Sequence, residues 1–432
     1  MSILKAVRGT RDLLPPETEL WNRIEATARA VFARYNFGEI RTPVFEDTQL
    51  FARGVGEETD IVSKEMYTWE DRARAQSEKA QSLTLRPENT AGVVRAYIEH
   101  GLGDSGLLQK LYYIGPQFRR ERPQRGRYRQ FFQIGAEVIG PTSAGSESPL
   151  RDAEVLEMLA TLLDELGIAG WTLKINSVGS SSDRPRYVAA LREALRDVAP
   201  TMCSDCQRRA ETNPLRVLDC KVPEDQPIID ALPRIADFLD EASKAHFAAV
   251  RAALDACAVP YEVSPRLVRG LDYYTRTTFE FLQESTGPLG TQNALLGGGR
   301  YDGLSEMLGG PRAPGIGFAI GADRLVLTLQ AQAGSEQPRL ADAYIAPLGD
   351  ALAPEALKLA HDLRRAGLRI ELGDSGFRLK RSFETADKLA RHIVLLGEDE
   401  SQSGILTVKQ FATGQQTRIP RAELAAALSA SS

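Results

Sequence analysis

Histidine and cysteine are both scarce in this sequence, with four of each among 432 residues. No two histidines stand close enough in the chain to form a motif, and their positions are His100, His246, His361 and His392. This argues against a catalytic metal held by histidines and against a Ser–His or Cys–His nucleophile. The chemistry must therefore be sought in other residue types.

The cysteines suggest a metal site only weakly. Cys203 and Cys206 have the spacing of metal ligands, and Cys220 could be a third ligand, but the second half of a CxxC pair is missing. Cys257 stands apart. We therefore expect no metal site and interpret the cysteines as ordinary reduced residues, with a structural zinc as the alternative.

Long apolar runs are absent as well. No stretch of about 18 apolar residues occurs, so we expect no transmembrane helix and no membrane partner. The N-terminal residues lack the apolar stretch of a signal peptide, which predicts a cytoplasmic protein. The hydrophobic fraction of 43% and the charged fraction of 26% are typical of a globular protein. Because the net charge is −5, any polyanion must bind at a local positive patch.

Phosphate-binding loops of the common kinds are missing. The sequence has no GxxxxGK[ST], and its GGGRYDG segment (297–303) lacks the context of a dinucleotide-binding turn. A different feature suits phosphate: residues 119–129, RRERPQRGRYR, carry six arginines and one carboxylate. Segments that favour strands, 111–118 and 130–140, flank them. Such a loop can hold polyphosphate or a nucleic-acid backbone, although a solvated surface loop is the alternative.

The strand after this loop has two unlike faces, because alternate residues of a strand point to opposite sides. One face is apolar and can pack into a core: Phe132, Ile134, Ala136 and Val138. The other offers a ring, an amide, a gap and a carboxylate: Phe131, Gln133, Gly135 and Glu137. That second face is either simply wet or the floor of a pocket.

Changes in pattern divide the chain. Residues 18–35 have helical spacing, with Thr18 as a possible N-cap, and 38–45 form an extended segment in which Pro43 favours an edge or an interface. Residues 179–258 are helix-prone and rich in Ala, Arg and Asp, which predicts a helical insertion. After a linker at 333–340, strands and helices alternate, which predicts a small α/β domain with a mostly parallel sheet.

Three separated arginines are candidates for one anion site. Arg119 begins the arginine loop, Arg269 lies in a turn before aromatic residues, and Arg324 lies in the first turn of a helix, where the helix dipole favours anions. Together they suggest activation of a carboxylic acid by ATP. That reaction needs cations, Mg²⁺ among them, to hold two anions together, and it needs no histidine.

Several motifs give a specific resemblance at this point. The segment around Pro43 resembles the class II synthetase dimer motif, FRRERPQRGRYRQFFQIGAE the second class II motif, and GIGFAIGADRL the third. LVRGLDYYT and GGGRYDGL resemble the two signatures of histidyl-tRNA synthetases, and RPENT their amino-acid-binding loop. The chain thus resembles a class II histidyl-tRNA synthetase over nearly its full length.

The resemblance implies an α+β fold: a class II antiparallel sheet flanked by helices, a helical insertion, and a C-terminal α/β anticodon-binding domain. The expected domains are a catalytic core in two parts, 1–178 and 259–332, interrupted by the insertion at 179–258. The linker at 333–340 leads to the anticodon-binding domain at 341–432. The implied reaction is ligation of histidine to its tRNA, with histidine, ATP and histidine tRNA as partners and a homodimer through the segment around Pro43.

Roles on the nucleotide side follow from the resemblance. Arg119 would bridge the substrate carboxylate and the α-phosphate, and Arg269 would contact that phosphate from the other side as the charge stabiliser. Glu121 would face the adenine, which would stack between Phe131 and Arg324. We expect no metal ligands beyond those of ATP-bound Mg²⁺.

Roles on the amino-acid side follow in the same way. The loop that holds the α-amino group would comprise Glu88, Asn89 and Thr90, with Gln133 opposite. Arg119 and Arg269 would reach the same substrate.

Glu137 and Tyr274 would recognise the imidazole, with Tyr273 nearby, since a carboxylate accepts its N–H and a phenol satisfies the other nitrogen. Asn89 and Asp323 depart from the family pattern, where glycine and glutamate are expected.

The acceptor end of the tRNA would meet the loop tip at Gln124, Arg125 and Arg127, and the insertion would clasp the acceptor arm. A rival hypothesis is a catalytically silent paralogue, the regulatory subunit of ATP phosphoribosyltransferase, which senses histidine. Such subunits usually lack the C-terminal domain and the arginines, both of which this chain retains.

Overall fold

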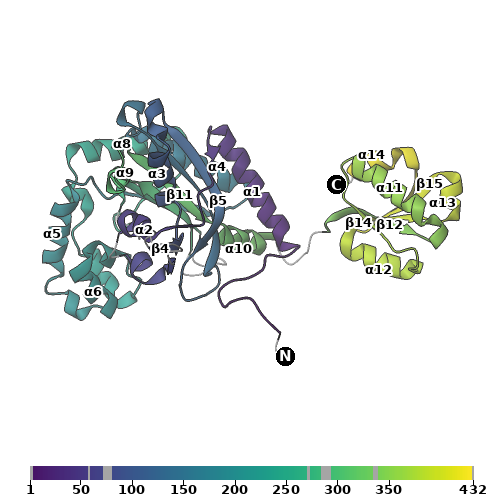
Figure 1. Cartoon of the computed structure of the whole chain (residues 1–432), viewed down its shortest axis with the longest axis horizontal. Helices are drawn as coiled ribbons and strands as arrows, with labels where there is room; N and C mark the ends of the chain where they lie inside the picture. Colours follow the sequence, from purple (N-terminus) through teal and green to yellow (C-terminus); the bar gives the residue numbers. More distant parts are fainter. Residues whose placement is uncertain are drawn as a thin grey trace. The chain divides into compact units, whose positions relative to one another are not determined.

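The computed structural model describes residues 3–56, 59–71, 80–269, 273–283, 293–333 and 339–430. The chain divides into two compact units, Met1–Gly334 and Ser335–Ser432 (Figure 1). Within the described residues, no helix is long and apolar enough to cross a membrane.

The first unit is built on an eight-stranded sheet, counted over the described residues, in the order β1-β5-β6-β11-β10-β9-β7-β8. Neighbours from β5 to β7 are antiparallel, and only the short edge strands β1 and β8 pair in parallel. The strands are β1 (Gly38–Glu39), β5 (Gln109–Phe118), β6 (Gln130–Ile139), β7 (Trp171–Ser177), β8 (Glu262–Val263), β9 (Thr275–Gln283), β10 (Ala294–Arg300) and β11 (Gly315–Gly321).

Helices α1 (Glu17–Arg34), α4 (Pro149–Glu165), α8 (Glu241–Ala256) and α10 (Ala322–Ala333) pack on one face of this sheet. The helical spacing of Trp21, Ile24, Ala28 and Val31 places all four in the shared core. Helix α1 begins one residue earlier than the sequence predicts. Pro16 takes the N-cap position, so the prediction of Thr18 as the N-cap is wrong.

On the other face lies the smaller sheet β2-β4-β3, formed by β2 (Phe45–Asp47), β3 (Tyr67–Asp71) and β4 (Gln81–Leu85). Helices α2 (Thr48–Val55), α3 (Thr90–Glu99) and α9 (Leu304–Met307) accompany it. Arg86 connects this region to the main sheet. Its guanidinium donates to the carbonyls of Thr42 at 2.9 Å, Pro43 at 3.3 Å and Pro116 at 2.9 Å.

The predicted insertion at 179–258 divides into two parts. Helices α5 (Arg184–Leu195), α6 (Ser204–Thr212) and α7 (Gln226–Asp230) share a small core of their own with the turns between them. Helix α8 does not belong to it, because Val250 and Leu254 pack in the main core beside α4. The segment with a separate core therefore ends before α8.

The second unit has a five-stranded sheet, counted over the described residues, in the order β13-β12-β14-β15-β16. Its first three strands are parallel and the last two antiparallel. The strands are β12 (Ala341–Pro347), β13 (Ile370–Leu372), β14 (Ala390–Leu396), β15 (Ile405–Gln410) and β16 (Gln416–Pro420), and the helices are α11 (Ala353–Arg365), α12 (Leu379–Leu389), α13 (Glu398–Ser403) and α14 (Leu424–Ala430). Helices α11 and α14 pack against the sheet in one hydrophobic core, and α12 packs against it in a second.

Candidate functional site

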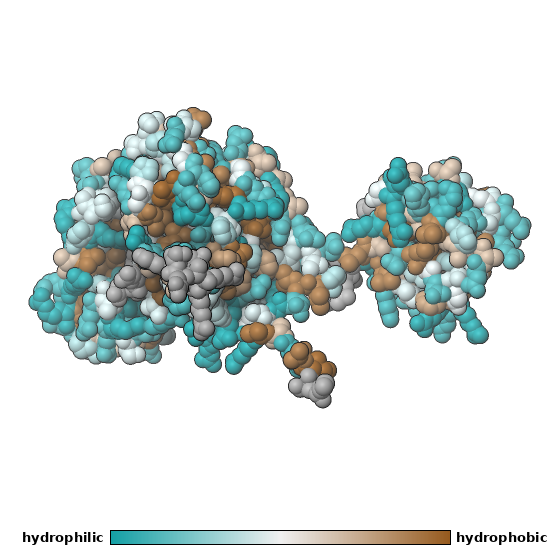
Figure 2. Space-filling view, in the orientation of Figure 1, coloured by the Kyte–Doolittle hydropathy of each residue, from teal (hydrophilic) through white to brown (hydrophobic). Residues whose placement is uncertain are grey.

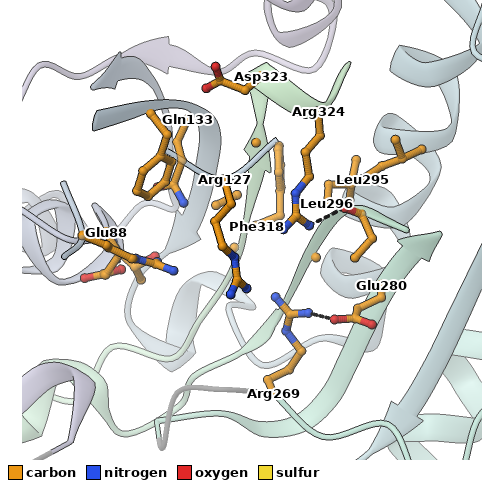
Figure 3. Close-up of a pocket in the computed structure, with 18 of the residues that line it drawn as sticks. Glu88, Arg127, Gln133, Arg269, Glu280, Leu295, Leu296, Phe318, Asp323 and Arg324 are labelled. Atoms are coloured by element: carbon orange, nitrogen blue, oxygen red, sulfur yellow. Dashed lines mark hydrogen bonds and ion pairs between the residues drawn. The ribbon is translucent and has the colours of Figure 1, made fainter. Parts of the chain in front are cut away.

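A cavity of about 230 Å³ opens over strands β6, β9, β10 and β11 of the first unit. Side chains from distant parts of the chain line it, and Arg119, Arg269 and Arg324 are all among them. Figure 3 shows Arg127, Arg269 and Arg324 directing their guanidinium groups toward the same space. The cavity therefore gathers positive charge at one place, as binding of a polyphosphate requires.

The two faces of strand β6 differ as the alternation of its sequence predicts. Phe132 packs edge-on against Trp21 with ring centroids 5.3 Å apart, and Ile134 lies in the core. Phe131 and Gln133 line the cavity on the opposite face. The side-chain oxygen Oε1 of Gln133 is buried and has no hydrogen-bond partner among the described residues, so it can accept from a ligand.

Glycines in β10 and β11 make room for the side chains that cross the cavity floor. A Cβ atom on Gly297 would lie 2.6 Å from the Arg269 guanidinium, and one on Gly299 would lie 2.8 Å from the ring of Tyr274. Any larger residue would displace these groups. The glycine-rich segments 297–299 and 315–317 thus act by leaving space and do not form a phosphate loop.

One carboxyl group, that of Glu137, does not itself line the cavity but is held by the hydroxyl groups of two residues that do, Thr90 and Tyr301. Glu137 is fully buried. Thr90 Oγ1 donates to its Oε1 at 2.7 Å, and the hydroxyl of Tyr301 donates to its Oε2 at 2.6 Å. Burial raises the pKa of Glu137 to about 8, against these two hydrogen bonds, which lower it. The sequence analysis did not predict this contact of Tyr301, which was noted only as part of the GGGRYDGL segment.

Tyrosines enclose this carboxylate. The rings of Tyr273 and Tyr274 lie 4.7 Å apart, and those of Tyr273 and Tyr301 lie 5.9 Å apart. All three line the cavity. Burial raises the pKa of Tyr274, so its hydroxyl keeps its proton and remains a hydrogen-bond donor. A ring with two nitrogen atoms would find a phenol and a carboxyl group here.

Helix α3 begins at the cavity wall and holds Glu88. The carboxylate of Glu88 accepts from the backbone N–H groups of Thr90 at 2.8 Å and Ala91 at 2.9 Å. Burial nevertheless raises its pKa. Asn89 does not line the cavity; its Oδ1 accepts from Thr42 Oγ1 at 2.8 Å, which fixes the loop from behind.

Arg119 and Glu121 form the near wall. Arg119 Nε donates to the carbonyl of Pro87 at 2.8 Å, and its guanidinium lies 5.3 Å from the centroid of the Phe131 ring. Glu121 lies between two arginines, with oxygens 3.7 Å from Arg119 Nη1 and 2.7 Å from Arg127 Nε. Arg127 therefore turns into the cavity, whereas Gln124 and Arg125 stay exposed outside it.

Arg269 is held by a carboxylate that sequence reasoning missed. Its Nη1 pairs with Glu280 of β9. Burial lowers the pKa of Arg269, but Glu280 and Tyr274 raise it by more. A signal was present in the sequence, because Glu280 interrupts a run of apolar and β-branched residues at 277–282. Residues 270–272, which follow Arg269, lie outside the described residues.

Helix α10 carries Arg324 into the far wall. Arg324 Nη1 donates to the carbonyl of Ala294 at 2.6 Å, and burial lowers its pKa. The neighbouring Asp323 is fully engaged: its Oδ1 lies 3.1 Å from Arg11 Nη2, and its Oδ2 accepts from Phe132 N at 3.1 Å. Asp323 thus fastens the helix start to the end of β6.

Comparison with known proteins agrees with this geometry. The family model described as Histidyl-tRNA synthetase matches residues 9–325, and the one described as Anticodon binding domain matches residues 342–431. The chain is 71% identical over 424 residues to the histidine–tRNA ligase of Koribacter versatilis, covering 98% of this chain and 95% of that one. It is 58% identical to the histidine–tRNA ligase of Solibacter usitatus over the full length of both.

Among solved structures, apo histidyl-tRNA synthetase of S. aureus superposes with a TM-score of 0.76 at 38% identity, covering 99% of this chain and all of that one. The sheet flanked by helices and the C-terminal domain define a class II aminoacyl-tRNA synthetase fold. With the full-length matches above, the chain belongs to the histidyl-tRNA synthetase family.

Proposed function

We propose that this chain is a histidine–tRNA ligase. It activates L-histidine with ATP to give histidyl-adenylate and pyrophosphate, and then transfers the histidyl group to the 3′ hydroxyl of the terminal ribose of its tRNA. One observation carries the proposal: three guanidinium groups from distant parts of the chain line one cavity together with Thr90 and Tyr301, whose hydroxyl groups donate to the buried carboxyl group of Glu137. Because tRNA charging is a cytoplasmic reaction, we place the protein in the cytoplasm.

The amino-acid end of the cavity suits histidine. Glu137 and Tyr274 would bind the two imidazole nitrogens, with Tyr273 beside the ring. A pocket that pairs both nitrogens rejects apolar isosteres, because they would leave its buried polar groups unpaired. The α-amino group would lie against Glu88, Thr90 Oγ1 and the free Oε1 of Gln133.

The nucleotide end of the cavity suits ATP. The adenine would stack between Phe131 and Arg324 and face Glu121. Arg119 would hold the histidine carboxylate beside the α-phosphate, and Arg269 would approach that phosphate from the opposite wall. A carboxylate oxygen then bonds to the α-phosphorus as the bond to pyrophosphate breaks. The guanidinium groups stabilise the charge that builds up on the phosphorus oxygens.

The cavity also contains oxygen ligands of the type that Mg²⁺ prefers, the carboxylates of Glu121 and Glu280. Each is already paired with an arginine. These residues fit a cation that shares its coordination sphere with ATP, and bound Mg²⁺ would neutralise phosphate charge. Asp323 lines the cavity as well, and its two oxygens are likewise engaged, by Arg11 and the backbone N–H of Phe132.

In the second step the ribose 3′ hydroxyl attacks the carbonyl carbon of the adenylate and AMP leaves. No described side chain is needed as a base, since the departing phosphate can accept the proton. Gln124 and Arg125 are exposed at the loop tip, where they could meet the acceptor end of the tRNA. The second unit would bind the anticodon, and the insertion the acceptor arm.

We also propose a homodimer through the segment around Pro43. Large apolar side chains are exposed next to it: Val44 is 39% exposed, Phe45 52% and Trp69 40%, and the rings of Phe45 and Trp69 lie 6.0 Å apart. Apart from these residues, the N-terminal segment, marked N in Figure 1 and partly coloured as hydrophobic in Figure 2, exposes Ile3 and Leu4. Pairing of two copies would remove this apolar surface from water.

Amino-acid-dependent exchange of pyrophosphate into ATP, measured with each of the twenty amino acids, tests the proposed activity. We expect exchange with histidine alone. No exchange with any amino acid would instead favour the regulatory subunit of ATP phosphoribosyltransferase. No observation favours that alternative, because the arginines line one cavity and the C-terminal domain is present.

A further inference from the structure

The helical insertion contains a compact group of metal-ligand atoms far along the chain from the cavity. One side-chain atom from each of Cys203, Cys206, Cys220 and Asp225 lies within 4.8 Å of the others. The sulfurs of Cys203 and Cys220 are 3.9 Å apart, and Oδ2 of Asp225 is 3.3 Å from the Cys220 sulfur. A tetrahedral zinc with Zn–S bonds of about 2.3 Å places its sulfurs about 3.8 Å apart, so the spacing fits.

The charge of Asp225 points to a cation at the centre of this group. Asp225 is only 2% exposed. Among the described residues, the contacts of its carboxylate are hydrogen bonds and not ion pairs: both oxygens accept from the backbone N–H of Cys203, at 3.2 and 3.3 Å, and Oδ2 also accepts from the thiol of Cys220 at 3.3 Å. A buried carboxylate without a cation is costly. A divalent ion bound by the same group would supply the missing charge.

Three separate segments deliver these ligands. Cys203 precedes helix α6 and Cys206 lies in its first turn. Cys220 follows a 3₁₀ turn at Pro214–Asp219, and Asp225 ends the next 3₁₀ turn, Pro223–Asp225. The backbone N–H of Val222 donates to the sulfur of Cys220 at 3.4 Å, a bond that favours a thiolate. The surrounding turns are short, so a bound ion would connect segments that little regular structure holds together.

Neither an apolar core nor a disulfide accounts for this group as well as a metal does. Cys206 and Cys220 pack in the small apolar core of the insertion. A purely apolar core would be destabilised by a buried carboxylate among its thiols, so apolar packing does not explain Asp225. A disulfide fails on distance. The four cysteines are free, and the 3.9 Å between the sulfurs of Cys203 and Cys220 far exceeds a bond of about 2.05 Å.

We propose that Cys203, Cys206, Cys220 and Asp225 form a structural Zn²⁺ site, with three thiolates and one carboxylate as ligands. All four positions of a tetrahedron are taken by protein, so the site has no place for substrate. None of the four residues lines the catalytic cavity. The metal stabilises the fold of the insertion and takes no part in the chemistry of adenylation. This proposal replaces the expectation of ordinary cysteines.

The first test is metal analysis of the full-length chain produced with added zinc. We expect about one zinc per chain, lost in Cys206→Ser and Cys220→Ser and retained in Cys257→Ser, which alters an exposed cysteine outside the group. If the wild type binds no zinc, or if Cys206→Ser retains it, the site does not exist. Mass spectrometry of the unreduced protein gives a further check, because a native disulfide among these cysteines would also overturn the proposal.

The second test identifies the ligands without relying on variants that fold poorly. Titration of the metal-depleted wild type with Co²⁺ should give strong thiolate-to-cobalt absorption, and its absence would refute thiolate ligation. Asp225→Asn should weaken Co²⁺ binding by at least about tenfold. The control Asp219→Asn, an exposed aspartate that pairs with Lys221, should not. Equal affinity in the two variants would remove Asp225 from the ligand set.

Discussion

The carboxylate of Glu137 fills the space that a side chain on Gly317 would need. A Cβ atom on Gly317 would lie 1.6 Å from Oε2 of Glu137. The two residues face each other across the pairing of β6 with β11. The glycine in β11 is therefore a condition for burying the carboxyl group of Glu137 between these two strands.

Gly317→Ala should displace Glu137 and damage recognition of histidine. We expect kcat/KM for histidine in pyrophosphate exchange to fall by at least about a hundredfold, since a small displacement in a closely packed site has such effects. Gly38→Ala is the matched control, because a Cβ atom there meets nothing within 4 Å. Similar activity in both variants would contradict the proposed role of Glu137.

Arg269→Ala should reduce adenylate formation by roughly a hundred- to a thousandfold, the usual cost of losing one group that stabilises the transition state. Histidine binding, measured by calorimetry, should change little. The substitution leaves the carboxylate of Glu280 without its partner. The double variant Arg269→Ala, Glu280→Gln therefore distinguishes the loss of the guanidinium group from the effect of an unpaired negative charge. Arg266→Ala, which alters a half-buried arginine that pairs with Asp230 and Gln226 and does not line the cavity, serves as the control. Full turnover in Arg269→Ala would refute the assignment.

The raised pKa of Glu137 should make stability depend on pH. Its pKa is about 8 in the folded protein and near 4.5 in the unfolded chain. Between these values the unfolded chain has lost the proton that the folded protein keeps, so the free energy of unfolding falls as pH rises, by a few kcal/mol in total, to order of magnitude. Below about pH 4.5 and above about pH 8 this contribution is constant.

Glu137→Gln should remove that fall. Thermal unfolding of both proteins from pH 5 to 9 measures it, and the difference between the two curves cancels the other titrating groups. The variant should gain stability over the wild type as pH approaches 8. Parallel curves across the whole range would show that Glu137 titrates normally.

A buried ion pair should matter more to stability than an exposed one. Arg300 and Asp152 are both fully buried and hydrogen-bonded to each other, and Arg300 also donates to the carbonyl of Ser146 at 2.9 Å. Asp152→Ala leaves a buried guanidinium without its main partner and should cost roughly 3–5 kcal/mol. Glu147→Ala removes the nearer of two carboxylate partners of Arg312, which is 56% exposed, and should cost at most about 1 kcal/mol. Equal shifts in Tm would contradict this ranking.

The loop tip should act in tRNA charging and not in adenylation. Arg125→Glu should raise KM for tRNA while pyrophosphate exchange stays unchanged, because Arg125 is exposed and lies outside the cavity. The dependence of tRNA binding on salt should weaken, since one phosphate contact is lost. An equal loss in both reactions would place Arg125 in the catalytic machinery.

The spacing of apolar residues predicted helices and strands well where either the helical or the alternating period was clear. The alternation of β6 separated Phe132, now in the core, from Gln133, now in the cavity. It could not show that Tyr301, 164 residues away from Glu137 in the chain, donates to it. Likewise the composition of α8 resembles that of the insertion, yet α8 packs on α4. The sequence of an amphipathic helix shows which of its faces is apolar but not which apolar surface that face will contact.

The convergence of Arg119, Arg269 and Arg324 could not be deduced from periodicity either. Each lies in a turn or at an element end, where arginine is common, and the sequence resemblance was needed to connect them. Asp225 gave no signal at all: it follows Cys220 by five residues, and only the turn between them brings its carboxylate to the thiols. Contacts of this kind depend on loop geometry, which spacing along the chain does not encode.

Arg86 has a mechanical consequence. Its guanidinium binds the backbone carbonyls of Thr42 and Pro43, while the residues directly after it, Pro87 and Glu88, hold Arg119 and the start of α3. A displacement of the backbone at Thr42 and Pro43 would therefore reach the loop at residues 87–90, in the cavity wall, through the Arg86 side chain. Any neighbour pressing on that backbone, a second copy of the chain included, would adjust the fit of the substrate from outside the pocket.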